Sequence, residues 1–465
     1  MTPDPYPSNA CPAENRRAVV ERYVSRTPGS KRAHDKAAEL LPAGVNRNIV
    51  HHGPHPLFVE RAEGPYLFDP DGNRYLDLIA NYTAMVLGNA VPEIVRAAEA
   101  QIRNGTAWAA ASPGEAQLAA MIVERVPSAE RVRFAASGTE ATMMVMRAAR
   151  AHTGKPVIAK FEGGYHGLSD FAMVSVAPDP DASGPDDAPH SMLTPGLAPA
   201  IAENLIVLPF NQPDDVRRIV EQNASRLAGI IVEPVMGNAG LLMPQPGFLE
   251  LLRELANKHN IVLIFDEVIS FRLAWGGAQE IYGVTPDLTT LGKIIGGGFP
   301  IGAVCGRADI MQWFDPTKAG GAITLSGTFH AAPVALAAGV ESMKLFDRDA
   351  IAKLNARSTQ LADELRAVFA NAALPLSLNQ CGSLLNLHVL AEAPQRYRPG
   401  ARGDKMFLKL LHLALLNEGL LVSPRGLFCT SVPMKEADYN AIVDGFARAL
   451  TALGVLPAEP VRKRA

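Results

Sequence analysis

Cysteine is scarce in this chain. Its four cysteines, Cys11, Cys305, Cys381 and Cys429, are scattered through 465 residues, and no two of them stand at the spacing of a metal-binding pair. Spacing of this kind disfavours a disulfide framework and a zinc site, and it fits a reducing compartment. We therefore expect neither a metal site nor disulfide bridges.

Long hydrophobic runs and blocks of like charge are also missing. The first residues lack the apolar core of a signal peptide, and no uninterrupted apolar run is long enough to span a bilayer. Lysine and arginine number 44 against 47 for aspartate and glutamate, a net charge of −3, and neither sign forms a long block. The sequence thus argues against nucleic acid and membrane as partners, and it predicts a cytoplasmic protein.

What the chain does contain is a long alternation of helical and strand-like segments. The alternation runs from residue 90 to residue 335 and predicts a large α/β domain with a mostly parallel sheet covered by helices. Residues 16–89, with hairpin punctuation, and residues 336–465, with mixed helices and strands, are expected to form a smaller α+β domain from both termini. Residues 1–15, rich in proline, asparagine and aspartate, are expected to be a mobile arm.

One segment inside the large domain differs from its surroundings. Residues 177–199 are dense in proline, aspartate, glycine and serine. Loops of this length within a domain are uncommon and often act as lids, but a plain surface excursion fits the same composition. The sequence leaves both interpretations open.

The chain is organised around an apolar strand that ends in two acids. Ile261–Phe265 reads as a strand buried on both faces, and Asp266 and Glu267 follow at its carboxyl end, where open α/β sheets bind ligands. Lys293 comes shortly after, between apolar residues and the glycines Gly296–Gly298. Desolvation would lower the pKa of such a lysine and make it an amine nucleophile. Taken singly, the acid could be a helix cap and the lysine could be solvated.

Together, a buried acid and a nucleophilic lysine are the two groups that pyridoxal phosphate needs. The lysine forms the covalent link with the cofactor, and the acid pairs with the pyridinium nitrogen. The wording FDEV at 265–268 and TPDLTTLGKIIGGG at 285–298 resembles the class III (fold type I) pyridoxal-phosphate aminotransferases. Within that class it is most similar to glutamate-1-semialdehyde aminomutases and the related β-amino-acid (β-phenylalanine) aminotransferases. The resemblance runs from about Leu41 to about Pro433.

This resemblance implies a fold type I transferase that uses pyridoxal 5'-phosphate, with Lys293 and Asp266 as catalytic residues. Ser137, Gly138 and Thr139 leave a strand and enter a helix, whose N-terminus favours an anion, although an ordinary helix cap explains the same residues. In the family, the matching Ser-Gly-Thr binds the cofactor phosphate. The threonine that matches Thr328 reaches the phosphate of the neighbouring subunit. The resemblance therefore implies a homodimer with shared active sites.

Residues for the cofactor ring follow from the same resemblance. An aromatic residue among glycines, such as Tyr165, can stack on a planar ligand. The family pattern places Tyr165 over the ring and Val268 under it, while His166 either contacts the cofactor or only supports the loop. Asn238 matches an asparagine near the ring oxygen in the aminomutase-like branch. Met236 stands where many class III aminotransferases carry glutamine, so that residue's role is not transferred.

Arginines are the expected substrate-binding residues, because the guanidinium fork suits a carboxylate. Arg47 lies in a loop between two asparagines, Arg425 lies in a Ser-Pro-Arg-Gly stretch, and Arg272 just past the acids is a further pocket candidate. Each alone could be a surface or structural arginine. In the β-amino-acid branch, the arginines that match Arg47, in the first loop, and Arg425, in Ser-Pro-Arg-Gly, bind substrate carboxylates.

Two departures from the family wording leave the substrate open. The asparagine-rich continuation of Gly-Thr-Phe in the β-amino-acid branch is replaced by His330-Ala331-Ala332. The Ser-Pro-Val-Arg wording of the aminomutase loop is missing as well.

We predict an aminotransferase that moves an amino group from an amino acid, preferably a β-amino acid, or from a bulky amine to a keto acid such as 2-oxoglutarate or pyruvate. The alternatives are a 2,1-aminomutase acting within one molecule, an amine (omega) aminotransferase without β-amino-acid preference, and a scaffold that has lost catalysis. The presence of Lys293 and Asp266 weighs against the scaffold.

Overall fold

The computed structural model describes residue 6, residue 8 and residues 10–457. The rest of the predicted N-terminal arm and residues 458–465 lie outside the described residues. Within residues 1–15, Tyr6, Ser8 and Cys11 are buried, and helix α1 already begins at Ala13. The mobility of the arm stays a prediction.

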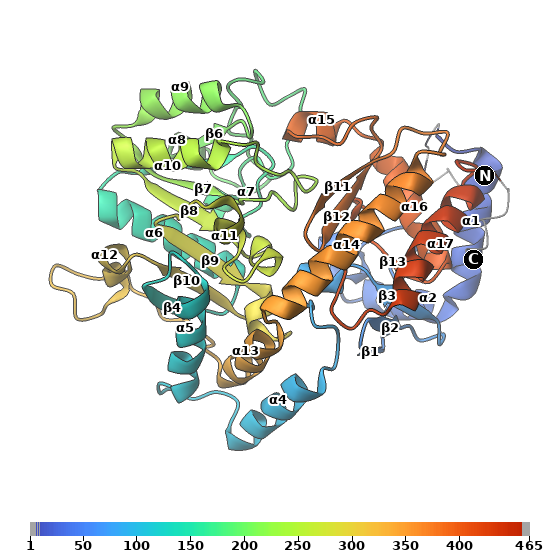
Figure 1. Cartoon of the computed structure of the whole chain (residues 1–465), viewed down its shortest axis with the longest axis horizontal. Helices are drawn as coiled ribbons and strands as arrows, with labels where there is room; N and C mark the ends of the chain where they lie inside the picture. The colour runs from blue at the N-terminus through green and yellow to red at the C-terminus, as the bar shows by residue number, and fades with distance from the viewer. Residues whose placement is uncertain (1–5, 7, 9, 458–465) are drawn as a thin grey trace.

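The large domain is built on a seven-stranded sheet, which lies in the left half of Figure 1. Strands β9, β8, β7, β5 and β6 run parallel in that order, and β10 runs antiparallel between β4 and β9. This arrangement confirms the predicted α/β fold with a mostly parallel sheet. The strands are β4 (Arg131–Ala135), β5 (Val157–Phe161), β6 (Leu205–Leu208), β7 (Leu227–Val232), β8 (Val262–Asp266), β9 (Leu288–Gly292) and β10 (Gly302–Gly306).

Both faces of this sheet are covered by helices, which explains why its central strands are apolar throughout. Successive side chains of a strand point to opposite faces. Leu263 and Phe265 of β8 therefore pack with the helices α9 and α10, whereas Val262 and Ile264 pack with α6 on the other face. The helices of this domain are α4 (Pro92–Asn104), α5 (Pro113–Arg125), α6 (Gly138–Thr153), α7 (Asp170–Met173), α8 (Ala200–Glu203), α9 (Pro213–Asn223), α10 (Phe248–His259), α11 (Ala278–Tyr282), α12 (Ala308–Met311) and α13 (Pro333–Leu345).

The smaller domain combines both ends of the chain, as predicted. Strand β13 near the C-terminus pairs in parallel with β3 near the N-terminus, which completes the sheet β1-β2-β3-β13. A second, antiparallel sheet has the order β11-β12-β14. The strands are β1 (Arg61–Glu63), β2 (Tyr66–Phe68), β3 (Arg74–Asp77), β11 (Ser377–Cys381), β12 (Leu384–His388), β13 (Leu420–Leu421) and β14 (Leu427–Cys429).

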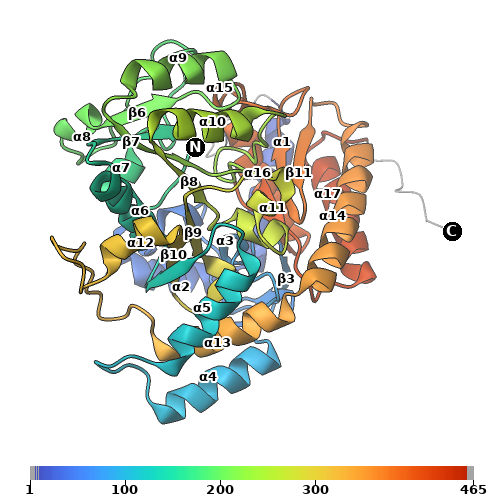
Figure 2. The ribbon, with the colours of Figure 1, turned by 60° about the vertical axis from the view of Figure 1, so that its left-hand side comes forward.

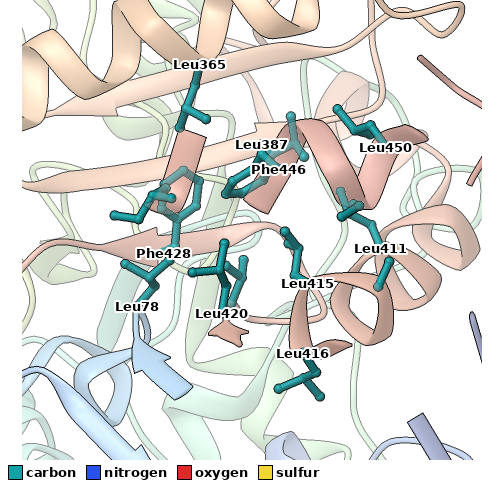
Figure 3. Close-up of a cluster of buried hydrophobic side chains, with 14 of the residues drawn as sticks. Leu78, Leu365, Leu387, Leu411, Leu415, Leu416, Leu420, Phe428, Phe446 and Leu450 are labelled. Carbon is teal, nitrogen blue, oxygen red and sulfur yellow. The ribbon is translucent and has the colours of Figure 1, made fainter. Parts of the chain in front are cut away.

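One hydrophobic core joins these sheets to their helices. Leu78 from the N-terminal part packs in the same cluster as Phe428 and Phe446 from the C-terminal part (Figure 3), and the two phenylalanine rings lie 5.5 Å apart. The helices are α1 (Ala13–Arg26), α2 (Pro28–Ala38), the short α3 (Ala80–Thr83), α14 (Arg348–Phe369), α15 (Tyr397–Ala401), α16 (Lys405–Asn417) and α17 (Glu436–Ala452). Neither terminal segment could bury its apolar face without the other.

The predicted boundary at residue 335 falls inside a helix. Helix α13 packs against α4 and α5 of the large domain, and Figure 2 shows α13 and α4 side by side at the lower edge. The exact domain limits therefore stay a prediction. None of the helices within the described ranges is long and apolar enough to cross a membrane.

The segment 177–199 contains no helix or strand and is tied to α15. The Tyr397 hydroxyl donates to Pro178 O at 2.7 Å, and the guanidinium of Arg398 donates to the carbonyls of Ser183, Gly184 and Pro185. None of its residues lines the cavity described below. The structure therefore favours the surface excursion over the lid.

Candidate active site

The carboxyl ends of the sheet strands open into a cavity of about 380 Å³. It lies where parallel strands of an open α/β sheet bind ligands. Among the residues that line it are nine that the sequence predicted: Arg47, Ser137, Gly138, Thr139, Tyr165, His166, Asp266, Val268 and Lys293.

Asp266 ends β8 and is fixed by three contacts. Its Oδ1 accepts hydrogen bonds from Val268 N at 3.2 Å and from Thr290 Oγ1 at 3.0 Å. Its Oδ2 lies 2.8 Å from Nδ1 of His166. The residue is only 5% exposed. A carboxylate held in this way is oriented before any ligand arrives.

His166 is buried next to Asp266, and burial lowers its pKa, although the nearby carboxylate opposes that effect. A neutral ring that donates from Nδ1 to Asp266 leaves Nε2 as an acceptor. That Nε2 is buried and meets no hydrogen-bond partner in the described part of the chain. The Thr142 hydroxyl donates to the His166 carbonyl at 2.6 Å and fixes its backbone. His166 therefore supports both the loop and the acid.

Lys293 follows directly on β9 and lines the same cavity. Its φ is +50°, a left-handed backbone conformation that is uncommon for a residue with a side chain. Desolvation lowers the pKa of its amine, while the charges of Asp266 and Glu233 oppose the shift. A lowered pKa makes the unprotonated, nucleophilic amine more available near neutral pH.

The N-terminus of α6 faces the cavity and offers an anion site. The Ser137 hydroxyl accepts from Glu140 N at 3.2 Å and so caps the helix. Gly138 and Thr139 are the first two residues of the helix, so their N–H groups have no acceptor within it and can serve an anion. A Cβ at Gly167, where φ is +89°, would lie 2.5 Å from Thr139 Oγ1. Glycine at this position therefore lets the loop of Tyr165 approach the helix end.

Glu233 lines the cavity, although the sequence did not single it out. Its two oxygens accept from Tyr165 N at 2.9 Å and Gly237 N at 3.1 Å, and burial raises its pKa to about 8. It directly follows β7, just as Asp266 ends β8. An acid at the carboxyl end of a buried strand was the available signal.

Lys160 stabilises the loop that carries Tyr165 and His166. Its ammonium is fully buried on β5 and donates to the carbonyls of Gly164, Ala172 and Val174, and burial lowers its pKa to about 7. These carbonyls bracket the stretch that carries Tyr165 and His166. Lys160 therefore fixes the loop that carries the predicted ring-contacting residues.

The far wall of the cavity, which we call the arginine wall, consists of Arg47, Asn81 and Tyr82. Arg47 Nη1 donates to Asn81 Oδ1 at 2.9 Å, and its guanidinium carbon lies 6.0 Å from the Tyr82 ring centroid. The same residues line a second, largely apolar cavity of about 540 Å³. The arginine wall therefore separates the two cavities.

Helix α3, which carries Asn81 and Tyr82, is a left-handed turn. All four residues of Ala80–Thr83 have φ between +46° and +77°, and none is glycine. Left-handed helical backbone costs roughly 1–2 kcal/mol per residue, so contacts elsewhere must stabilise this turn. Asp77 does so at its start, where Oδ1 accepts from Ala80 N at 2.8 Å and Ile79 N at 3.1 Å.

Three predicted residues lie outside the lining of the first cavity. Asn238 is half-buried, and Thr328 and Arg425 are exposed. The guanidinium of Arg425 has no hydrogen-bond acceptor among the described residues, and desolvation lowers its pKa against the influence of Tyr82 and Tyr165. Two residues of the cavity lining, Tyr82 and Tyr165, thus influence Arg425 electrostatically, and the roles of all three predicted residues stay predictions.

The prediction of Arg272 as a pocket residue was wrong. Its side chain is fully buried, and its donors are used by Thr83 O, Ser383 Oγ and Thr430 O. It does not line the cavity.

The chain is similar to known proteins over most of its length. The family description "Aminotransferase class-III" matches residues 49–450. The glutamate-1-semialdehyde 2,1-aminomutase of Desulfotalea psychrophila is 41% identical, over 88% of this chain and 94% of that protein. The solved ω-transaminase of Sphaerobacter thermophilus is 40% identical with a TM-score of 0.89, over 93% of this chain and 99% of that one. The β-phenylalanine aminotransferase of Variovorax paradoxus is 34% identical with a TM-score of 0.87, over 96% and 99%.

Proposed function

Because this chain belongs to the class III aminotransferases, enzymes that use pyridoxal 5'-phosphate, we propose that it moves an amino group on a carboxylate-bearing substrate in the cavity around Lys293. The observation that carries the proposal is the single cavity that combines the amine of Lys293, the fixed carboxylate of Asp266 and the guanidinium of Arg47. An amine, an acid and a carboxylate-binding fork are what such a substrate requires.

The cavity residues fit pyridoxal 5'-phosphate. The N–H groups of Gly138 and Thr139 suit its phosphate, and the buried carboxylate of Asp266 suits a protonated ring nitrogen. Lys293 has an amine whose lowered pKa suits the covalent attachment. When bound, the cofactor accepts electron density from the carbon that carries the amino group.

The protein's own contribution is to hold charges and move protons. Asp266 keeps a proton on the ring nitrogen, and His166 keeps Asp266 in place. Lys293, once free, takes the proton from the substrate carbon as general base. Tyr165 and Val268 would face the two sides of the ring, and Asn238 would lie near the ring oxygen.

Two reactions are compatible with this chemistry, and relatives favour the first. Sequence relatives at about 40% identity include glutamate-1-semialdehyde 2,1-aminomutases, so a shift of the amino group within one molecule is the first candidate. That relationship favours the alternative over the predicted β-amino-acid donor. Transfer to a separate keto acid is the second candidate. It is supported by the similarity to the ω-transaminase.

The requirement for an acceptor separates these reactions. Purified holoenzyme is given glutamate-1-semialdehyde alone, and a panel of β-amino acids and simple amines with and without 2-oxoglutarate or pyruvate. Formation of the isomer with its amino group moved from carbon 2 to carbon 1, without a keto acid, would establish the aminomutase. Conversion of donors only when a keto acid is present would establish the aminotransferase. No reaction with any compound would refute the proposed function.

The two arginines provide a prediction about substrate class. We expect Arg425→Ala to impair the half-reaction with an amino acid, and Arg47→Ala to impair the dicarboxylic acceptor more. An unpaired, desolvated carboxylate costs about 2–5 kcal/mol. Stopped-flow measurement of each half-reaction tests this, with Arg61→Ala as the control, because Arg61 stacks on Phe68 outside the cavity. If Arg425→Ala leaves β-amino acids unaffected and plain amines react better, the β-amino-acid substrate must be abandoned.

Thr328 provides a prediction about assembly. We propose a homodimer in which Thr328 of each subunit contacts the phosphate held by Ser137, Gly138 and Thr139 of the other. Thr328 is exposed and does not line the cavity of its own subunit, which supports this arrangement. Thr328→Ala and Lys293→Ala are each expected to be inactive, and heterodimers formed from the two should recover part of the activity, because one of their two sites is intact. Mixed dimers as inactive as both parents would contradict shared sites.

A further inference from the structure

Arg272 is a buried cation without a carboxylate. It is 0% exposed, and its guanidinium donates to three uncharged oxygens: Nε to Ser383 Oγ at 3.0 Å, Nη1 to Thr83 O at 3.1 Å and Nη2 to Thr430 O at 2.6 Å. The thiol of Cys429 is a further hydrogen-bonding neighbour. No acid within the described ranges forms an ion pair with it. A guanidinium buried in this way is costly unless its hydrogen bonds are all made, so its contacts indicate a specific role.

The partners of Arg272 belong to three different segments. Thr83 closes the left-handed turn α3, Ser383 lies in the connection between β11 and β12, and Thr430 directly follows β14. Arg272 itself lies shortly after Asp266, in the short helical turn Ser270–Leu273. The side chain therefore ties the strand of the buried acid to the α3 turn and to the sheet of the smaller domain.

The contact with Thr83 matters because α3 positions the arginine wall. The left-handed turn is anchored by Asp77 at its first residues and by Arg272 at its last carbonyl. Between these two anchors lies Asn81, whose Oδ1 accepts from Arg47. The position of Arg47 in the cavity therefore depends on both anchors.

The contact with Thr430 involves the segment of the second arginine. Arg425 precedes β14, and Thr430 follows it. The end of β14 is also bonded directly to the chain before α3, since Cys429 N donates to Leu78 O at 2.7 Å. Arg272 thus bridges the α3 turn, whose Asn81 accepts from Arg47, and the end of the strand that follows Arg425.

We propose that Arg272 is a positioning residue for substrate recognition, which fixes the arginine wall and the separation of Arg47 from Arg425 without touching substrate or cofactor. The inference rests on the proposed function, because it assumes that these arginines bind substrate carboxylates. It adds a specific consequence: loss of Arg272 weakens carboxylate binding while the cofactor site, built by α6, β8 and β9, is preserved.

The test compares Arg272→Met with a matched control, Arg125→Met. Arg125 is also a buried arginine without an ion-paired acid among the described residues, and its Nε donates to Trp275 O at 3.0 Å. Its guanidinium packs on the rings of Phe271 and Trp275, so Arg125→Met disturbs the segment that carries Arg272 without removing the hydrogen bond to Thr83 O. The ligand is glutarate, a dicarboxylate without an amino or keto group, titrated into holoenzyme by the cofactor's absorbance. Cofactor affinity is measured separately by fluorescence, and amide exchange is followed over residues 78–86.

We expect Arg272→Met to weaken glutarate binding about tenfold or more, since small misplacements of binding groups have effects of this size or larger. Its cofactor affinity should change less than about twofold, and exchange over 78–86 should accelerate, because the α3 turn loses an anchor. Arg125→Met should change neither glutarate binding nor this exchange. In an Asn81→Ala background the effect of Arg272→Met should shrink, because the two residues act in series.

Wild-type-like glutarate binding in Arg272→Met, or a parallel loss of cofactor affinity, would overturn the proposal. If Arg272→Met does not fold, Arg272→Lys replaces it: a lysine cannot reach three acceptors in a fixed fork, so glutarate binding must still weaken. Should wild-type holoenzyme bind no glutarate, carboxylate recognition itself is refuted. The positioning role is then judged by exchange alone, and unchanged exchange over 78–86 would exclude it.

Discussion

Lys293→Ala is expected to abolish amino-group turnover. The substitution removes both the amine that attaches the cofactor and the general base that moves the substrate proton. General acid–base catalysis alone contributes about 10²–10⁴-fold, so loss of both functions should exceed that range. Borohydride treatment of the wild-type holoenzyme should fix the cofactor covalently to a peptide containing residue 293, and mass analysis should find no such adduct in the variant.

Lys155→Met is a suitable control for this experiment. Lys155 does not line the cavity, and its ammonium donates to the carbonyls of Ala224, His259 and Asn260. Lys155→Met therefore removes a partly buried lysine without changing the site. It should retain turnover and the trapped adduct. A Lys293→Ala enzyme with full activity would end the assignment of Lys293, whatever the control does.

The parts of the fold that the sequence predicted are those with a strong local signal. The apolar run before Asp266 could be recognised as a buried strand because it is short, rich in branched residues and bounded by polar ones. Strand β10 (Gly302–Gly306) was not predicted, since GAVCG is short, begins and ends with glycine and shows no alternation. It exists because β4 and β9 flank it on both sides. Strand β14 was not predicted either, because it has only three residues.

The left-handed turn α3 lies beyond any local pattern. Its sequence, Ala-Asn-Tyr-Thr, contains no glycine, so the usual signal for positive φ is missing. The conformation is imposed by Asp77 and Arg272, and the second of these is about 190 residues away in sequence. The same distance explains the error with Arg272: its position after the acids suggested the pocket, whereas its three acceptors come from segments that only the folded chain brings together.

Some residues of the candidate site could be predicted from local sequence signals, and others could not. Asp266 and Ser137 could be placed because each follows a predicted strand, and the topology of a parallel sheet brings carboxyl ends to one edge. Lys293 was identified from its apolar and glycine neighbours and from the family resemblance, since β9 was not predicted as a strand. Lys160 and Thr290 could not, because their roles depend on which carbonyls and carboxylates meet them in space. Glu233 had the same signal as Asp266 and could have been predicted.

Asp266→Ala is expected to slow deamination strongly while the cofactor can still attach to Lys293. Without the carboxylate, the ring nitrogen loses the opposite charge that keeps its pKa high, so the ring accepts electron density less well. Removal of one partner of a buried ion pair costs about 3–5 kcal/mol. If the transition state bears about 3 kcal/mol of that cost, the rate falls on the order of 10²-fold.

Asp266→Asn separates charge from geometry. The amide oxygen can still accept from Thr290 Oγ1 and Val268 N, as Oδ1 does now, so the site keeps its shape while the charge is lost. If Asp266 acts through charge, Asn should be nearly as slow as Ala in single-turnover deamination, and borohydride should still trap the cofactor in both variants. A fast Asn variant beside a slow Ala variant would assign Asp266 a purely structural role, and near-normal rates in both would remove it from catalysis. Because His166 lies against Oδ2, the Asn variant also presents an amide to Nδ1, so the His166 ring must change tautomer or lose that hydrogen bond.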